Sequence, residues 1–408
     1  MTYRAYFKLR VTLFSPLSIG DSFSENTDKD VVLDSRGLPV IPATSIAGVL
    51  RSLASDSEKD ALFGCINKDG KVQQDTLLAF YDATLYEARA VTARDCVKLN
   101  EYKTAERGAK FDFQAVETGA VFVGYAEARG EEAKKALEGL LQNTLSFGSK
   151  TTRGYGKIKL AYQCREFQPD DLEEWLKFDM FDWPDGDWLE IAPETSQGSV
   201  TLKLELKQQG GLSIRQYMTE EKGADYGPMA LCDGSPVIPG TSWAGMFKHH
   251  MSVWLSKDEM RCAFGFVLTG EEEKDAKKKN LPACQKSRIM FSESQITGGT
   301  QKLLTRNMID RFTNGTKDGA LYTEKTVYGG TTILEITLDI SDMQYTGCKD
   351  ILVNVKRALC TTILDLHNGY AAIGGLTAVG RGLFKVTQIN GEPFNGGFNT
   401  LKEVLGCV

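Results

Sequence analysis

The sequence lacks the features that mark several common classes of protein. It has no apolar run near the ~18–20 residues needed to cross a bilayer, and residues 1–10 alternate charged and apolar side chains, unlike a signal peptide. None of its nine cysteines forms a C-x-x-C pair, and an odd number fits neither a disulfide framework nor a zinc ribbon. Three histidines leave little material for histidine catalysis or a histidine-rich metal site. We therefore expect a reduced, cytoplasmic protein that makes no membrane contact.

An excess of positive charge is also lacking. The 408 residues include 48 basic and 54 acidic side chains, and the net charge of −6 argues against a protein that grips nucleic acid by bulk charge. The charge is uneven, because residues 165–197 hold eleven acidic residues against Arg165 and Lys177. That segment also contains three tryptophans, so we expect it to pack on a surface, such as an adjacent subunit, rather than to act as a free tether.

The chain carries an internal repeat with a period of about half its length. The matched segments keep the same order, and the offset between them grows along the chain, which indicates insertions in the second copy. The pairs are Val40–Arg51 with Val237–Lys248, Ala61–Gly64 with Cys262–Gly265, and Arg153–Ile158 with Arg381–Val386. We therefore divide the chain into a first domain at 1–164, an acidic linker at 165–197 and a second domain at 198–408.

Both copies show the same succession of elements. Period-two alternation predicts a first strand over Ala5–Leu13 and over Val200–Leu206, because alternate side chains of a strand share one face. An amphipathic helix follows the Ile-Pro segment, then a β-rich middle, a second amphipathic helix, a glycine-rich turn and a last strand. The order β-α-β-β-α-β predicts an α+β protein of two tandem ferredoxin-like (RRM-like) domains.

The first repeated motif opens the first helix of each copy. Pro42 and Pro239 precede the helix, and Thr44-Ser45 and Thr241-Ser242 offer N-cap oxygens. An electropositive helix start attracts phosphate, a glycine lets a ligand backbone approach, and a cation follows one or two turns later. The residues that this pattern predicts to bind phosphate are Ser45, Gly48, Arg51, Ser242, Gly245 and Lys248. The alternative is a plain helix cap with a glycine at a helix–sheet contact, but a cap does not require the glycine and the basic residue together.

The second repeated motif is a glycine-rich turn near the end of each copy, at Phe147–Gly156 and Ile373–Gly382. Its glycines permit positive φ and expose N–H groups to a phosphate. No Gly-Lys-Ser/Thr follows at the spacing of a Walker loop. The residues predicted to contact phosphate are Lys150, Arg153, Gly154, Arg381 and Gly382. An ordinary turn between two elements is the alternative.

In combination, the Ile-Pro-Ala/Gly-Thr-Ser segment and the glycine-rich turn with Arg-Gly resemble the RAMP superfamily, and within it the backbone subunits of type III CRISPR effector complexes. The resemblance covers both copies, roughly residues 1–164 and 198–390. It implies a tandem fusion of two backbone subunits. Such a protein would hold the phosphates of a CRISPR guide RNA through the two motifs, pair that guide with target RNA, and assemble with other subunits of the complex.

The resemblance also implies a β-hairpin thumb inserted in each domain, which interrupts the guide–target duplex and displaces a base. Residues 94–113 and 306–328 are polar, basic and punctuated by glycine, as a protruding hairpin would be. An ordinary solvated loop is the alternative for each segment.

In type III complexes, an aspartate in the loop after the first strand cleaves target RNA. The resemblance puts it at Asp28 in the first copy, with Asp30 next, and at Asp225 in the second. Such a carboxylate would orient the RNA 2′-OH, accept its proton, or hold a divalent cation such as Mg²⁺. Aspartate is also common in loops for turn reasons, and the two copies differ around it, so cleavage by both, one or neither copy stays open.

The leading interpretation is a metal-dependent endoribonuclease subunit that binds guide RNA and cleaves complementary target RNA. One alternative is a scaffold subunit of the same complex that binds RNA without cutting it. Another is a guide-processing ribonuclease that acts alone on repeat RNA, which the scarcity of histidine counts against.

Overall fold

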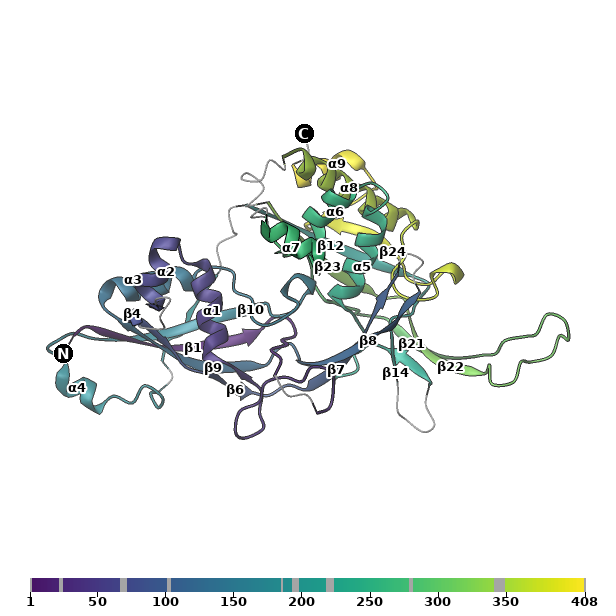
Figure 1. The fold of residues 1–408 in the computed structure, drawn as a ribbon. Helices are drawn as coiled ribbons and strands as arrows, with labels where there is room; N and C mark the ends of the chain where they lie inside the picture. The colour runs from purple at the N-terminus through teal and green to yellow at the C-terminus, as the bar shows by residue number, and fades with distance from the viewer. Residues whose placement is uncertain are drawn as a thin grey trace. The chain divides into compact units, whose positions relative to one another are not determined.

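Figure 1 shows the computed structural model of the chain. The structure describes residues 2–21, 25–66, 72–100, 104–184, 186–192, 198–217, 224–278, 282–340 and 349–406. Two compact units form: unit 1 comprises residues 1–98, 105–151 and 155–196, and unit 2 comprises residues 99–104, 152–154 and 197–408. Residues 193–197, the end of the predicted linker, lie outside the described residues.

Unit 1 is built around its long first strand, β1 (Arg4–Leu13). The alternate residues of β1 from Ala5 to Leu13 are buried, as the period-two pattern predicts. β1 lies between β10 (Ile158–Phe167) and β9 (Val121–Arg129) and is antiparallel to both. The sheet continues from β9 to β5 (Leu78–Phe80) and to β6 (Ala83–Glu87) with β2 (Val40–Ile41), while β11 (Leu189–Glu190) joins β10.

Two helices, α1 (Ala43–Leu53) and α3 (Glu131–Leu141), cover one face of this sheet (Figure 1). Ile46, Leu50 and Leu137 from these helices join the inward residues of β1 in one apolar core. The other elements of this part of the chain are α2 (Asp56–Phe63), β3 (Cys65–Ile66), β4 (Val72–Gln74), β7 (Val91–Leu99), β8 (Ala105–Val116), a 3-10 turn at Thr151–Arg153 and α4 (Leu172–Lys177).

Unit 2 repeats this plan with β12 (Ser199–Gln209) at the centre. β12 lies between β23 (Thr331–Asp339) and β24 (Leu383–Ile389), antiparallel to both, and β19 (Ile289–Phe291) and β25 (Glu392–Pro393) extend the sheet on either side. Trp243 and Phe247 of α5 (Gly240–Met251) and Leu359 of α8 (Lys349–Asn368) lie in its core. Both copies therefore have the predicted mixed α+β fold with antiparallel sheets.

A second five-stranded sheet in unit 2 carries one of the predicted thumbs. β21 (Thr300–Arg306) pairs with β22 (Tyr322–Tyr328), and β22 also pairs with β13 (Gly211–Leu212) and, in parallel, with β15 (Tyr226–Pro228), which pairs with β14 (Arg215–Tyr217). None of the described helices is long and apolar enough to cross a membrane. The remaining elements are β16 (Val237–Ile238), α6 (Lys257–Phe264), β17 (Phe266–Val267), α7 (Glu271–Lys278), β18 (Cys284–Gln285), β20 (Ser294–Gln295), a 3-10 turn at Thr377–Val379 and α9 (Phe398–Leu405).

The acidic segment finds its packing surface within unit 1. Residues 168–191, which we call the strap, contact the outward side chains of β1, on the sheet face opposite α1 and α3. Trp175 Nε1 donates a hydrogen bond of 2.9 Å to Tyr6 Oη, and the rings of Phe178 and Tyr6 are 5.1 Å apart. The Arg10 guanidinium lies 4.5 Å from the centre of the Trp188 ring. The segment is therefore a layer of unit 1 rather than only a connection between two domains.

We expect Trp175→Ala to destabilise unit 1 by about 2 kcal/mol, because the half-buried ring loses its packing and its hydrogen bond to Tyr6. Hydrogen exchange of the β1 amides, followed by mass spectrometry across a urea series, measures this effect on unit 1 alone. Leu176→Ala is the matched control, because the Leu176 side chain on the same helix is exposed. Equal exchange in the two variants would show that the strap does not stabilise the sheet.

Candidate functional site

The two aspartates predicted to cleave RNA occupy equivalent positions, each bound to a strand of its hairpin. Asp28 Oδ2 accepts the N–H of Asp112 on β8 at 3.0 Å. In the same way, Asp225 Oδ2 accepts the N–H of Thr323 on β22 at 2.8 Å. The backbone N–H of each aspartate donates back to the same residue at 2.8 Å, to the Asp112 carboxylate in the first copy and to the Thr323 carbonyl in the second. Asp112 and Thr323 therefore correspond, and each loop aspartate lies where the loop after the first strand meets the hairpin.

Asp112 is a candidate residue that sequence reasoning missed. It brings a second carboxylate to Asp28, whereas Asp225 has a threonine in that place. No motif surrounds Asp112, and only the pairing of β8 with the loop reveals it. The described residues include no group of three potential metal ligands from His, Cys, Asp and Glu. Mg²⁺ usually takes one or two carboxylates from a protein and completes its shell with water and substrate phosphate, so the divalent cation stays a prediction for this pair.

Asp30, the second candidate in the first copy, has a structural role in its loop. Its buried carboxylate accepts the backbone N–H groups of Glu25, Asn26 and Thr27, at 2.8 to 3.0 Å, and the Thr27 hydroxyl at 2.7 Å. These hydrogen bonds, led by those from Asn26 and Thr27, lower the pKa of Asp30 to about 2. We therefore assign Asp30 to shaping the loop that carries Asp28, and we leave the cleavage prediction with Asp28 and Asp225.

The first helices begin earlier than the sequence predicts. The N-cap residues are Pro42 and Pro239, which have no side-chain cap to offer, and their carbonyls accept the N–H groups of Ser45 and Ser242 at 2.9 Å. The two serines are therefore the third residues of their helices, and the prediction that they supply N-cap oxygens is wrong. Proline holds φ near −60°, which presets the backbone for the helix start, and in α1 the N–H of Ala43 donates to Asp82 Oδ1 at 2.7 Å.

The glycine and the basic residue of this motif lie on the exposed side of the helix. A Cβ added at Gly48 or at Gly245 would meet nothing within 4 Å, so neither glycine serves a helix–sheet contact. Gly48 and Arg51 line a cavity of about 320 Å³. The Arg51 guanidinium donates to the Gly64 carbonyl and to the Asp60 carboxylate, both at 3.2 Å, while Lys248 is exposed.

The two glycine-rich turns correspond glycine by glycine. Gly156 and Gly382 both have φ near +77°, and a Cβ on either would lie 1.9 Å from the carbonyl oxygen of the residue that opens the turn. Lys150 and Leu376 share a φ of 58° in the left-handed region. When the two turns are aligned in this way, Tyr155 rather than Arg153 is equivalent to Arg381. The match of Arg153 with Arg381 drawn from the Arg-Gly pair is therefore wrong.

The charged residues of the turns have different surroundings. Arg381 is buried, and its guanidinium already binds Glu324 and Thr326. Lys150 Nζ lies 3.5 Å from the centre of the Phe113 ring, and burial lowers the pKa of Lys150. Arg153 keeps one buried guanidinium nitrogen, Nη1, for which the described residues provide no hydrogen-bond partner. Of these three cations, Arg153 is therefore the one with a buried nitrogen that has no hydrogen-bond acceptor among the described residues.

The glycines predicted to contact RNA in these turns have a packing role. A Cβ on Gly154 would lie 2.6 Å from the backbone nitrogen of Glu293, within unit 2. A Cβ on Gly382 would clash with the carbonyl of Ile373. Glycine is therefore required at both positions by the protein's own backbone, and contact of these two turns with RNA stays a prediction.

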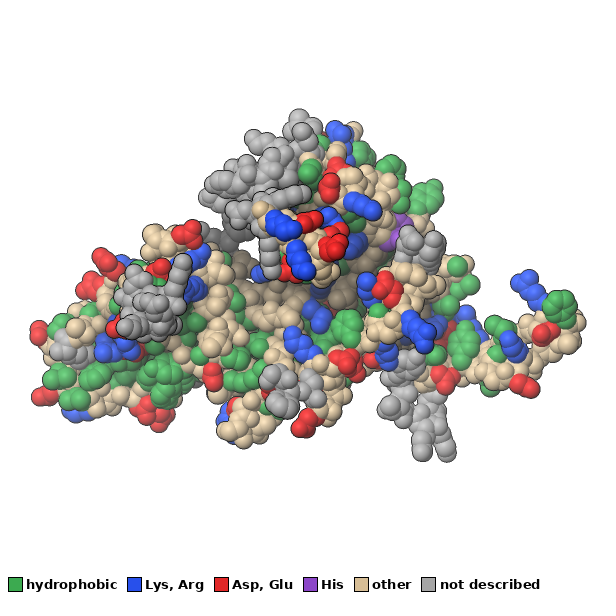
Figure 2. Space-filling view, viewed as in Figure 1, with side chains coloured by type: hydrophobic (Ala, Val, Ile, Leu, Met, Phe, Trp, Pro, Cys, Tyr) green, Lys and Arg blue, Asp and Glu red, His purple; other side chains and the backbone are tan. Residues whose placement is uncertain are grey.

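Both segments predicted as thumbs fold as hairpins. In unit 1, β7 pairs with β8, and residues 101–103 at the turn lie outside the described residues. In unit 2, the loop after β21 carries Phe312 with 97% of its surface exposed, and Asp310 Oδ1 holds the turn by accepting the N–H of Phe312 at 2.8 Å. Figure 2 shows exposed hydrophobic and basic side chains along this hairpin, at the right of the view.

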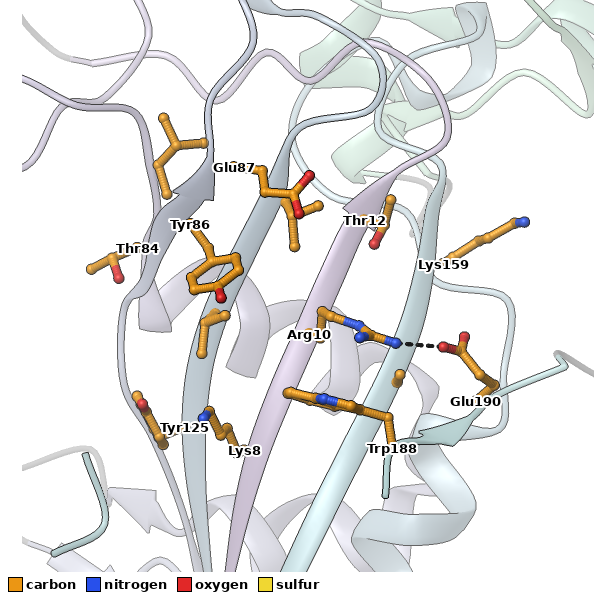
Figure 3. Close-up of a pocket in the computed structure, with 14 residues that line it drawn as sticks. Lys8, Arg10, Thr12, Thr84, Tyr86, Glu87, Tyr125, Lys159, Trp188 and Glu190 are labelled. Carbon is orange, nitrogen blue, oxygen red and sulfur yellow. Dashed lines mark hydrogen bonds and ion pairs between the residues drawn. The ribbon is translucent and has the colours of Figure 1, made fainter. Parts of the chain in front are cut away.

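A further pocket lies on the outward face of the unit 1 sheet, between the strands and the strap (Figure 3). Its volume is about 710 Å³, and Lys8, Arg10 and Trp188 line it. The strap neutralises the charge of Arg10 through an ion pair of 2.5 Å with Glu190, and Lys8 Nζ donates to the Trp183 carbonyl at 3.2 Å. None of the residues predicted to bind RNA lines this pocket.

The match to a protein family follows the internal repeat of the chain. A family model described as the RAMP superfamily matches residues 10–159 and 210–385, one segment for each copy. No curated protein matches the sequence significantly. Among solved structures, the chain is similar to a chain of the type III-B Cmr-β assembly in the apo state, at 12% identity and a TM-score of 0.33, over 40% of this chain and 98% of that one. It is also similar to a chain of type III-B Cmr-β bound to cognate target RNA, at 19% identity and a TM-score of 0.34, over 41% of this chain and 61% of that one.

We expect the Asp30 carboxyl to stay ionised down to about pH 2. Because its pKa lies below that of an unfolded carboxyl, its hold on the loop is present above the ordinary pKa, near 3.9, and is lost as the pH falls towards 2. An NMR titration of the carboxyl carbon measures this pKa. In Asp30→Asn, the amides of residues 25–27 should exchange faster at neutral pH, while Asp56→Asn, at an exposed helix start, should leave them unchanged. A measured pKa near 4 would contradict the assignment.

Proposed function

Because the chain belongs to the RAMP superfamily, we propose that it is a double backbone subunit of a type III-like CRISPR ribonucleoprotein. In this proposal, each copy is a ferredoxin-like domain with a hairpin thumb, and the strand orders β10-β1-β9-β6 and β24-β12-β23-β19 support that assignment. Both copies hold guide RNA, the hairpins meet the guide–target duplex, and the partners are target RNA and other subunits of the complex.

The observation that carries the catalytic part of the proposal is the equivalence of Asp28 and Asp225. Two loops of different sequence bring an aspartate to equivalent strands, where its carboxylate accepts the backbone N–H of the equivalent residue and its own N–H donates back to that residue. A turn-forming aspartate is common in loops, but a turn does not require the carboxylate to reach the same strand residue in both copies. The repeated placement supports a shared role at the base of the hairpin.

The exposed helix glycines support the proposed guide-binding role. A glycine inside a helix costs roughly 0.5–1 kcal/mol relative to alanine. Neither Gly48 nor Gly245 offsets this cost by packing, since a Cβ at either would meet nothing. A smooth helix face beside Arg51 or Lys248 suits the close approach of an RNA phosphate backbone.

The cleavage step would use a nucleophile that RNA itself carries. The 2′-OH of a splayed nucleotide attacks the adjacent phosphorus, its proton passes to the aspartate carboxylate, and the 5′-oxygen leaves and is protonated by water. The products are a 2′,3′-cyclic phosphate and a 5′-hydroxyl end. Asp28 and Asp225 orient the 2′-OH and accept its proton. A divalent cation, when bound, would offset the charge on the phosphate.

One observation favours a second candidate, a scaffold subunit that binds RNA without cutting it. The Oδ2 atoms of Asp28 and Asp225 already accept a backbone N–H, so these aspartates also have a structural role. The two functions differ in whether loss of the negative charge alone stops cleavage.

We expect Asp28→Asn and Asp225→Asn each to lower the rate of cleavage at one set of RNA sites by at least a hundredfold. The double variant should lower the rate at both sets. Asparagine keeps an oxygen that can accept the N–H of Asp112 or Thr323, so the loop stays in place while the proton acceptor is lost. The measurement is cleavage of guide-complementary RNA by the assembled complex. Asp258→Asn, an exposed position on α6, is the control. Unchanged cleavage by the double variant would leave the scaffold function.

We expect the double variant Gly48→Ala, Gly245→Ala to bind guide RNA about tenfold more weakly, while its thermal stability rises or stays the same. The methyl groups enter space that the RNA backbone would need, but alanine favours the helix. Gly139→Ala is a matched control, because Gly139 is also an exposed helical glycine with nothing within 4 Å of an added Cβ. Equal affinity for guide RNA in the double variant and in the control would show that Gly48 and Gly245 do not contact the guide.

A further inference from the structure

Unit 2 buries an ionic cluster at the base of its hairpin. Glu324 on β22 is only 2% exposed. Arg381, from the glycine-rich turn, donates through Nη2 to Glu324 Oε1 at 2.5 Å and through Nη1 to Thr326 Oγ1 at 2.8 Å. This charge-assisted pair satisfies the buried carboxylate and fixes the turn to the hairpin.

Two more arginines approach the same carboxylate from the solvent side. Arg215 Nη2 lies 3.6 Å from Glu324 Oε2, and Arg306 Nε lies 3.5 Å from Oε1. Their side chains are 35% and 39% exposed. Arg215 is held in place, because its Nε donates to Ser213 Oγ at 2.9 Å and its guanidinium lies 5.0 Å from the centre of the Tyr226 ring.

The charges in this cluster do not balance. Three guanidinium groups, which do not deprotonate in proteins, surround one carboxylate. Arg381 forms the shortest ion pair with Glu324, at 2.5 Å, whereas those of Arg215 and Arg306 are 3.6 and 3.5 Å long. Two half-exposed guanidinium forks with an excess of positive charge suit a phosphate, which both can bind through paired hydrogen bonds.

Unit 1 has neither the buried glutamate nor its closest arginine at the equivalent positions. One residue after the corresponding pair Asp112 and Thr323, Phe113 stands in the place of Glu324. The matched turns put Tyr155 in the place of Arg381. Phe113 and Tyr155 are buried in an apolar cluster, with ring centres 5.6 Å apart. The two copies therefore share a backbone plan at the base of the hairpin but differ in its chemistry.

We propose that Arg215 and Arg306 form a binding site for an RNA phosphate in the second copy, built on a glutamate–arginine pair that the first copy replaces with Phe113 and Tyr155. The site adjoins the candidate aspartate, because Tyr226 follows Asp225 and pairs with Glu324 across the parallel strands. Glu324 and Arg381 act as positioning residues that hold the base of the site. The inference rests on the proposed function in taking RNA as the polyanion that binds there.

The test measures binding of a labelled single-stranded RNA of mixed sequence to the full-length protein over a series of salt concentrations. Arg215→Gln with Arg306→Gln should weaken binding and reduce the slope of log affinity against log salt by about 0.7, the contribution of one phosphate contact on a single strand. Lys203→Gln with Lys207→Gln removes the same charge from exposed positions on β12, and its slope should change far less. An equal change in both double variants would overturn the site, because only general charge would then matter.

A lysine pair keeps the test decisive if the glutamine variant folds poorly. Arg215→Lys with Arg306→Lys retains the charge and should restore most of the slope, although it loses the paired hydrogen bonds. If the glutamine variant keeps the wild-type slope of log affinity against log salt, the phosphate site is rejected. If cleavage is then lost only in the aspartate variants, the proposed function still stands. A reduced slope together with unchanged cleavage in the Asp28→Asn, Asp225→Asn protein would retain the phosphate site and reject the cleavage assignment.

Discussion

One backbone hydrogen bond, present in both copies, joins the parts on which the candidate site depends. The amide that follows the first glycine of the turn donates to the carbonyl at the exit of the first strand, from Ser149 to Ser18 at 2.8 Å and from Gly375 to Ser213 at 2.7 Å. A Cβ on the preceding glycine, Gly148 or Gly374, would lie 2.6 Å from that carbonyl oxygen. Glycine is thus obligatory there, and the contact fixes the turn beside the loop that carries each candidate aspartate.

The shared backbone plan allows the two copies to diverge in their side chains. At the base of the hairpin, the first copy has an aromatic cluster and a pair of carboxylates, whereas the second has a buried glutamate among arginines. Neither arrangement changes the strand pairing that holds Asp28 or Asp225. A duplicated chain of this kind can therefore specialise its copies without altering its fold.

Local patterns predicted the elements that depend on local physics. Alternating side chains identified β1 and β12, since burial of one sheet face imposes a period of two. The serine caps failed because Pro42 and Pro239 already preset the helix starts. The Arg-Gly match failed because backbone geometry, not side-chain identity, sets the register of the turns. Glu324 and its arginines come from four separate segments, so only tertiary structure brings them together.

The strap also affects the edge of the unit 1 sheet. Its short strand β11 pairs with β10 at Ala161 and Tyr162, on the side of β10 that faces away from β1. An uncovered edge strand is a template on which another chain can add a strand and begin to aggregate. By pairing with Ala161 and Tyr162, β11, which contains Glu190 and closely follows Asp187 in sequence, shortens the stretch of this edge on which another chain could add a strand.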